Sequence, residues 1–157
     1  MSLNLTLNYN ITNQSFELLK QHIDKSYSML ENAKIFLDMD KLADFYSRSY
    51  YACYHSVNSL FYLYGLLVKS DVFSDNKEIS SHYALISFFN RYFIKTGIFD
   101  KNFSFILKKF KEYRMAADYR FDKFDKVEAV SDYDEGLNFL NVIKEHIEDG
   151  LKKIGKI

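Results

Sequence analysis

The sequence contains no proline, no tryptophan, five glycines and a single cysteine among its 157 residues. Proline breaks helices more strongly than any other residue, so its absence from the whole chain favours an all-α domain. The lone Cys53 excludes an intramolecular disulfide. It fits a reducing compartment, and we therefore expect a cytoplasmic protein.

Long apolar runs, a basic-then-apolar leader and net charge are also missing from the sequence. No apolar run approaches ~20 residues, so we expect neither a membrane span nor secretion. The formal net charge of +0 argues against a protein that binds nucleic acid mainly through its overall charge. A local binding site remains compatible with it. No glycine-rich phosphate loop is present, which argues against a nucleotide-dependent kinase or dehydrogenase.

The histidines and the cysteine are not spaced as the ligands of a metal site usually are. No two of the four histidines lie three or four positions apart, and only one cysteine is available. Structural and catalytic zinc sites need several such ligands close together. We therefore predict no metal site and no cofactor.

Apolar residues recur every three or four positions in five stretches, which predicts helices over 13–39, 41–64, 82–96, 102–117 and 132–149. Polar connections are expected over 66–79 and 118–130. The predicted caps are Thr12 or Asn13, Asp40, Ser80 or Ser81, Asp100 or Asn102, and Ser131; the predicted helix ends are Gly65, Gly97 and Gly150. The fold class is therefore an all-α, five-helix antiparallel up-and-down bundle.

Three parts of the chain follow from this pattern. Residues 1–12 alternate apolar and polar side chains, which predicts a short extended arm that packs on the helices or pairs with a partner; a loosely attached terminus is the alternative. Residues 13–150 form the helical domain. Residues 151–157 form a short basic tail.

Arg48 and His55 are the first candidates for chemistry, seven positions apart in the second predicted helix. At ~100° per residue the two side chains differ by only ~20° around the axis, so they share one stripe. This stripe lies away from the bulkiest apolar side chains, and the small Ala52 at its centre leaves room for a group to approach. An arginine can hold a phosphate and a histidine can act as general acid or base, which suits metal-independent RNA cleavage.

The spacing alone is also typical of a solvated or partner-facing polar stripe. Asp44, one turn before Arg48, could orient its guanidinium or form a plain surface ion pair. His82 is expected at the surface near a helix start. Arg114 continues an apolar stripe and needs a partner, for which Asp118, four residues later, is the candidate; a structural ion pair is the favoured interpretation.

The segment SRSYYACYH at 47–55, followed by Leu60 and Gly65, resembles the RAYYAMFHAA…LL…G helix of HEPN domains in their UPF0332-like branch. Two further blocks agree in order. Ser81-His82 ahead of Phe93 and Gly97 resembles the branch's TH…F…G segment, and RMAADY at 114–119 resembles its R…ADY segment. The resemblance spans roughly residues 15–150.

This resemblance implies a helical bundle that forms a homodimer, with the Arg-x(4–6)-His motifs of both chains at a shared cleft; Arg48 and His55 have six residues between them. Many members are metal-independent ribonucleases that act as toxins, often paired with a minimal nucleotidyltransferase antitoxin. In some, the antitoxin modifies a tyrosine two residues after the histidine. Val57 stands here, so that regulation is not carried over.

Our first hypothesis is an endoribonuclease of HEPN type, the toxin half of a toxin–antitoxin or defence module, acting on RNA. Its catalytic residues would be Arg48 and His55, supported by Asp44 and Tyr51. His82, Arg114 and Asp118 would be a second site or structural. The alternatives are a non-catalytic adaptor that binds RNA, a nucleotide or a nucleotidyltransferase, and a purely structural helical dimer.

Overall fold

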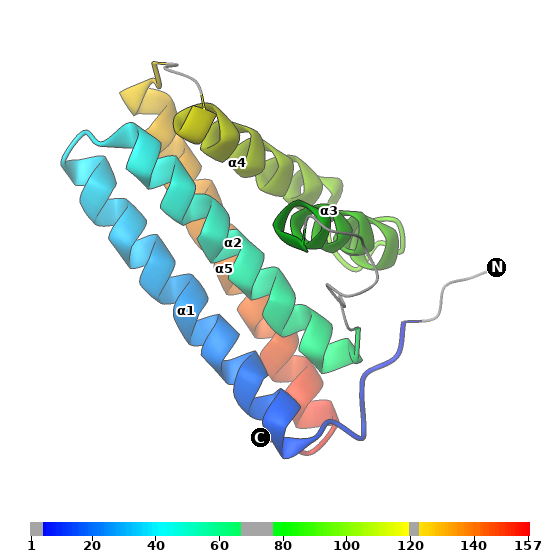
Figure 1. Ribbon diagram of the computed structural model, residues 1–157. Helices are drawn as coiled ribbons and strands as arrows, with labels where there is room; N and C mark the ends of the chain where they lie inside the picture. The colour runs from blue at the N-terminus through cyan, green and yellow to red at the C-terminus, as the bar shows by residue number, and fades with distance from the viewer. Residues whose placement is uncertain (1–4, 67–76, 120–122) are drawn as a thin grey trace.

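The computed structural model describes residues 5–66, 77–119 and 123–157. Five α-helices account for most of them, which confirms the predicted all-α, five-helix bundle (Figure 1). They are α1 (Asn13–Asp38), α2 (Leu42–Tyr64), α3 (Lys77–Phe89), α4 (Lys101–Tyr119) and α5 (Lys126–Lys153), with a π-helical segment η2 (Asn90–Ile94) after α3. Among the described residues, no helix is both long and apolar enough to cross a membrane.

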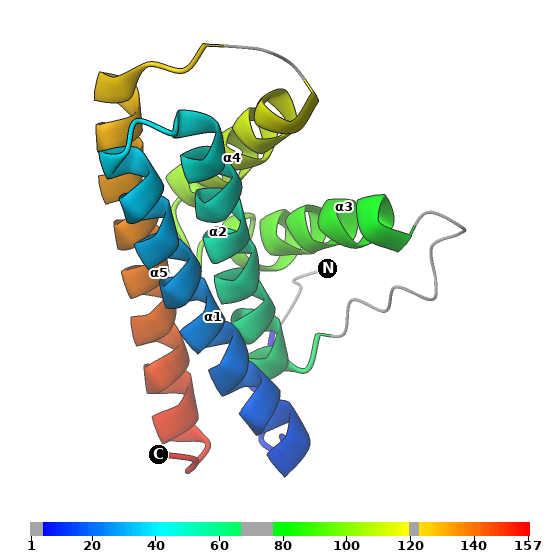
Figure 2. The ribbon, with the colours of Figure 1, turned by 60° about the vertical axis from the view of Figure 1, so that its left-hand side comes forward.

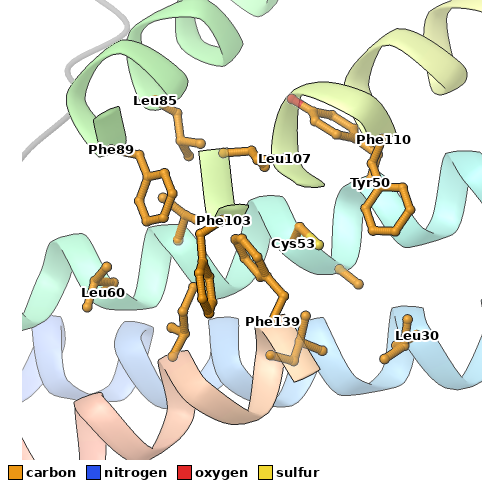
Figure 3. Packing of buried hydrophobic residues seen from close by; sticks show 14 of the residues in the cluster. Leu30, Tyr50, Cys53, Leu60, Leu85, Phe89, Phe103, Leu107, Phe110 and Phe139 are labelled. Carbon is orange, nitrogen blue, oxygen red and sulfur yellow. The ribbon is translucent and has the colours of Figure 1, made fainter. Parts of the chain in front are cut away.

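Helix α2 is the centre of the bundle. It packs along α1, α4 and α5, while α3 runs across the long helices and meets α2 over a short stretch (Figure 2). Buried side chains of all five helices fill the space between them (Figure 3). Much of this core is aromatic, and the rings of Phe89, Phe99, Phe103 and Phe139 form a continuous series of contacts.

The first helix begins and ends where the sequence predicts. Thr12 caps α1, because its side chain accepts a hydrogen bond from the Ser15 backbone N–H at 3.1 Å. The predicted break at Met39-Asp40 is confirmed, with Asp40 in the left-handed region at a φ of 57°. Lys126 of α5 donates to the Leu37 carbonyl and to Asp40 at this end of α1. Asp40 therefore does not cap α2, which begins after Lys41 without a side-chain cap.

The stripe on α2 that includes Ala52 is not open, contrary to the prediction. Ala52 and Ser59 are fully buried, and Ser59 donates from Oγ to the Leu19 carbonyl of α1 at 3.0 Å. Small side chains allow two helix backbones to approach closely, and α1 occupies the space that Ala52 leaves. Sequence patterning counts serine as polar and alanine as weakly apolar, so it misses this contact.

Helix α5 is longer than predicted at both ends. It begins at Lys126 inside the predicted 118–130 loop, and its N-cap is Asp125, which accepts from the Glu128 N–H; Ser131 lies inside the helix. Gly150 does not end the helix. A Cβ at Gly150 would lie 2.7 Å from a methyl carbon of Leu63 and 3.2 Å from one of Leu7, so a larger residue there would force these side chains to shift. The helix continues to Lys153, into the predicted tail.

Helix α3 also begins earlier than predicted. It starts at Lys77, so Ser80 and Ser81 lie within the helix rather than at its cap. Most of the predicted 66–79 connection lies outside the described residues. Gly97 follows the π-helical segment with a φ of 78°, and Gly65 closes α2 in the same left-handed region, as predicted for both.

The N-terminal arm packs against the end of the bundle at which α2 terminates. Over its described part, Leu5 and Leu7 are half-buried, Ile11 is buried and Tyr9 is exposed. The Asn8 backbone N–H donates to the Leu63 carbonyl at the end of α2 at 2.9 Å. The apolar edge of the alternating segment thus contacts the chain's own helices.

Candidate functional site

One side of α2 stays partly open to solvent between α1 and α3. We call it the α2 face; its half-buried or exposed residues are Arg48, Tyr51, Tyr54, His55, Asn58 and Tyr62. They recur every three or four positions, as residues on one side of a helix do. Both predicted catalytic residues lie on this face, at its boundary with α1.

Arg48 is exposed, and among the described residues its guanidinium hydrogen-bonds to a thioether sulfur but to no carboxylate. Its Nη1 lies 3.9 Å from the Met29 sulfur of α1. Asp44 is exposed one turn earlier, and no ion pair joins these two described side chains. The guanidinium donors therefore face solvent rather than a carboxylate, a state in which an arginine can take an anionic ligand.

His55 is half-buried and shares a hydrogen bond with a second histidine. Its Nδ1 lies 2.9 Å from Nδ1 of His22 on α1, so one ring donates an N–H and the other accepts. The His22 ring also stacks on Tyr62 at 5.6 Å between centroids. With Nδ1 engaged, Nε2 is the nitrogen of His55 that can exchange a proton with a substrate.

The surroundings of this pair favour neutral imidazoles. Burial, then the positive charges that His22 and Lys25 can carry, lower the pKa of His55 to about 4. Burial also lowers the pKa of His22. At neutral pH His55 is therefore available as a base rather than as an acid.

Tyr51 belongs to a different group, on the side of α2 that faces α3 and α4. Its ring lies 6.0 Å from that of His82, and the Arg114 guanidinium lies over it at 5.0 Å. Tyr54 contacts both His82 and His55, at 4.6 Å and 5.5 Å between centroids. Tyr54 thus connects the two groups along the α2 face.

His82 is buried rather than at the surface, so the expected surface position is wrong. It is 7% exposed, and its Nδ1 lies 2.6 Å from the Tyr50 hydroxyl. The Arg114–Asp118 ion pair is confirmed, with Nε and Oδ2 3.3 Å apart. Arg114 also lies over Tyr50 at 5.6 Å. These contacts hold α3 and α4 against α2, as expected for a structural role.

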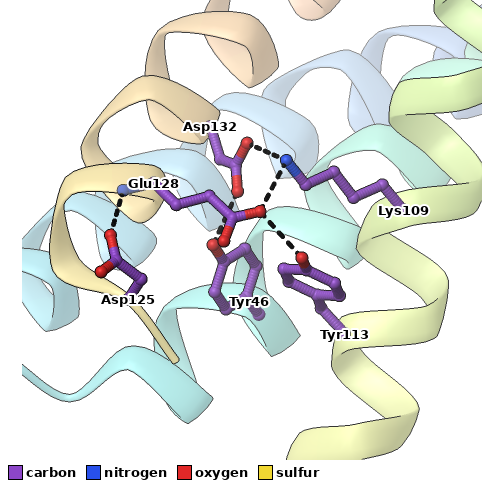
Figure 4. Close-up of polar contacts among 6 residues, drawn as sticks. All are labelled: Tyr46, Lys109, Tyr113, Asp125, Glu128 and Asp132. Carbon is purple, nitrogen blue, oxygen red and sulfur yellow. Dashed lines mark hydrogen bonds and ion pairs between the residues drawn. The ribbon is translucent and has the colours of Figure 1, made fainter. Parts of the chain in front are cut away.

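Two sets of residues were not singled out from the sequence. One is His22, which lies 33 positions before His55 and shows no pattern that connects them. The other is a polar network around the buried Asp132 (Figure 4). Asp132 contacts Lys109 Nζ and the Tyr46 hydroxyl, each at 2.6 Å. Glu128 contacts Lys109 at 3.1 Å and the Tyr113 hydroxyl at 2.8 Å. In the sequence, Lys108, Lys109 and Lys111 together predict a basic, solvated face on the fourth helix, whereas the structure pairs Lys109 with two carboxylates.

A sequence signal for Asp132 does exist. It precedes Gly136, Phe139, Leu140 and Ile143 at helical spacing, so it continues their apolar stripe backwards. An acid on such a stripe needs a buried partner. Within the described ranges, no group of three or more histidine, cysteine, aspartate or glutamate side chains could hold a metal ion.

Comparisons with known proteins add to this geometry. No protein-family model matches the chain. It is 27% identical over 139 residues to a "UPF0332 protein" of Thermotoga maritima, which covers 87% of this chain and 96% of that protein. It is 29% identical over 133 residues to "Putative toxin MJ0605" of Methanocaldococcus jannaschii, which covers 85% of this chain and 91% of that protein. Over most of its length the chain is thus similar to one protein named for the UPF0332 family and to one named as a putative toxin.

Proposed function

We propose that the protein is a metal-independent endoribonuclease of HEPN type and the toxin half of a toxin–antitoxin module. The observation that carries the proposal is that the exposed Arg48 and the half-buried His55 lie nearly two helical turns apart on the same α2 face. The toxin name of one relative supports the toxin role. The partner would be a nucleotidyltransferase antitoxin, as the resemblance implies.

In this proposal His55 acts as the base in an attack by a ribose 2′-hydroxyl. Its Nε2 takes the hydroxyl proton while the 2′-oxygen bonds to phosphorus and the P–O5′ bond breaks, which leaves a cyclic phosphate. The 5′-oxygen takes a proton from solvent. Arg48 neutralises the charge that builds on the phosphoryl oxygens, and such groups stabilise the transition state without a metal.

His22 has a positioning role in the same proposal. In the tautomer that this step requires, His55 Nδ1–H donates to His22 Nδ1 at 2.9 Å, which fixes the His55 ring and leaves its Nε2 unprotonated. Tyr62, stacked on His22, restricts that ring in turn. A homodimer formed through the α2 face would place two such sites next to each other. Equilibrium sedimentation, which measures the mass of the particle in solution, tests whether the dimer forms.

The test is cleavage of a fluorescent single-stranded RNA by the purified protein in EDTA. We expect His55→Ala and Arg48→Ala to lower the rate by about 100-fold or more, because general-base and charge-stabilising groups have effects of this size. Lys34→Ala, on exposed α1 surface, is the matched control and should keep the wild-type rate. Expression of wild type, but not of His55→Ala, should arrest growth.

Equal residual cleavage by wild type and His55→Ala, at equal melting temperature, would overturn the catalytic assignment. RNA binding without cleavage by any variant would identify the adaptor instead. His55→Asn keeps a polar side chain and separates loss of the base from loss of packing.

A further inference from the structure

A groove of about 870 Å³ lies between α3 with η2 on one side and α4 on the other. It is separate from the α2 face. Tyr83 of α3 and Met115 of α4 line the groove, whereas the adjacent His82 and Arg114 contact Tyr51 of α2. Helices α3 and α4 thus each present one side to α2 and another side to this groove.

The groove concentrates positive charge in a chain whose formal net charge is +0. Its cations are Arg91, Lys95, Lys108 and Lys111, and its one acid is Glu112. Glu112 neutralises little, because its contact with Lys108 is 3.9 Å long and both side chains are more than 60% exposed. Four cations against one carboxylate fit a ligand that carries several negative charges.

An exposed aromatic ring and an exposed thioether lie among these cations. Tyr83 is 70% exposed and Met115 is 47% exposed, and Ile86 adds further apolar surface. A ring beside several cations is the arrangement by which proteins bind single-stranded nucleic acid, since the ring stacks on a base while the cations contact phosphates.

The π-helical turn places two of the cations, Arg91 and Lys95, along one wall of the groove. The Lys95 N–H bonds to the Asn90 carbonyl at 2.9 Å, which closes the wide turn. Arg91 and Lys95 are four residues apart, and Arg91 is held over the Tyr92 ring at 5.6 Å. Asn90 Oδ1 is buried without a hydrogen-bond partner among the described residues.

We propose that this groove binds a segment of single-stranded RNA, with phosphates on Arg91, Lys95, Lys108 and Lys111 and a base on Tyr83. Duplex RNA fits less well, because its bases are stacked on each other and do not reach a side-chain ring. The site would hold the strand outside the cleavage site. It deepens the proposed function, on which it rests, by naming how the substrate is held, but its binding is measured independently of cleavage.

The experiment measures fluorescence anisotropy of a labelled single-stranded RNA in EDTA, with every protein in the His55→Ala background. We expect Lys108→Gln/Lys111→Gln to weaken binding about tenfold or more and to reduce the slope of log K against log salt by about 0.7 for each phosphate that is no longer neutralised. Tyr83→Leu should weaken binding about tenfold with little change in the slope. Lys20→Gln/Lys34→Gln, at two lysines of α1 whose side chains are 46% and 45% exposed, is the matched control and should change neither.

Unchanged affinity and slope in the groove variants would overturn the proposal, as would equal binding of duplex and single strand with no effect of Tyr83→Leu. A groove that serves an acidic protein partner would give that result. The two proposals fail separately. With His55 restored, groove variants that no longer hold long RNA but cleave a dinucleotide at the wild-type rate would support both. Lack of cleavage by wild type, with groove-dependent binding, would remove only the ribonuclease.

Discussion

Two polar clusters of the molecule pair their side chains in opposite ways. The Lys109–Asp132 network joins opposite charges, and both carboxylate oxygens of Asp132 have partners at 2.6 Å. Burial alone would lower the pKa of Lys109, but its hydrogen bonds to Asp132 and Glu128 raise it. The His22–His55 pair joins two like groups, and neither has a carboxylate partner among its described contacts.

The difference separates a structural cluster from a reactive one. In the network, both Asp132 oxygens have partners and the side chain is only 2% exposed, so a further ligand has no access to it. In the imidazole pair, each ring engages one nitrogen, and His55 stays half exposed. A low pKa with a hydrogen-bond position still available is typical of functional groups, although structural groups can share it. The predictions below test whether the two clusters differ in this way.

The largest expected effect is on stability, in the network. Lys109→Met removes the cation but keeps most of the side-chain length, and it leaves the Asp132 charge buried with only the Tyr46 hydroxyl. Breaking a buried pair from one side costs about 3–5 kcal/mol of unfolding free energy. We expect a loss near the lower end, because Lys109 is 32% exposed. Urea unfolding monitored by circular dichroism measures it.

The neighbouring lysine supplies the control. Lys108→Met removes an exposed cation with one weak contact to Glu112, so the loss should stay below about 0.5 kcal/mol. Equal losses for Lys108→Met and Lys109→Met would show that the network is no stronger than a surface ion pair, and the contrast between the clusters would disappear.

A smaller effect concerns pH and the imidazole pair. The folded-state pKa of His55 lies near 4, below the unfolded value of about 6.5, so the unfolded chain binds protons that the folded chain does not. Stability from this group is therefore full above about pH 6.5 and is lost as the pH falls toward 4. Because His55 is half exposed, we expect the loss between pH 7 and 5 to stay below about 1 kcal/mol.

Unfolding midpoints of wild type and of His22→Asn/His55→Asn, measured from about pH 7 to about pH 5, test this effect. Wild type should lose more stability over this window than the double variant. The network should not contribute there, because its hydrogen bonds from Tyr113 and Lys109 lower the pKa of Glu128, so Glu128 remains ionised. Parallel curves for the two proteins would contradict the lowered pKa of His55.

The helices that the sequence predicts well are those with clear caps and bulky apolar stripes. Thr12, the break at Met39-Asp40 and Gly65 mark the ends of α1 and α2 because each depends on local backbone geometry. The start of α5 escapes prediction because residues 118–130 mix acids, bases and aromatic side chains with no clear period, so that Asp125 does not stand out as the N-cap.

The candidate site shows the same limit. Arg48 and His55 can be placed on one stripe from spacing alone, and Arg114–Asp118 can be paired because the two lie one helical turn apart. His22 cannot be connected with His55 in this way, because their contact depends on how closely α1 and α2 approach. That approach is set by Ala52 and Ser59, which carry almost no hydrophobic signal.

The last test compares the coupling energies within the two clusters, measured by double-mutant cycles on unfolding free energy; the coupling of the imidazole pair is the smallest effect expected. For His22→Ala with His55→Ala we expect a coupling of about 0.5–1 kcal/mol, since a part-buried hydrogen bond between neutral groups contributes little net stability. For Lys109→Ala with Asp132→Ala the coupling should exceed about 2 kcal/mol, because each single change strands a charge that the double change removes. A coupling for the imidazole pair as large as that of the network would mean that the pair holds α1 to α2 as a structural bond. His22 would then be needed for folding rather than for the position of the His55 ring.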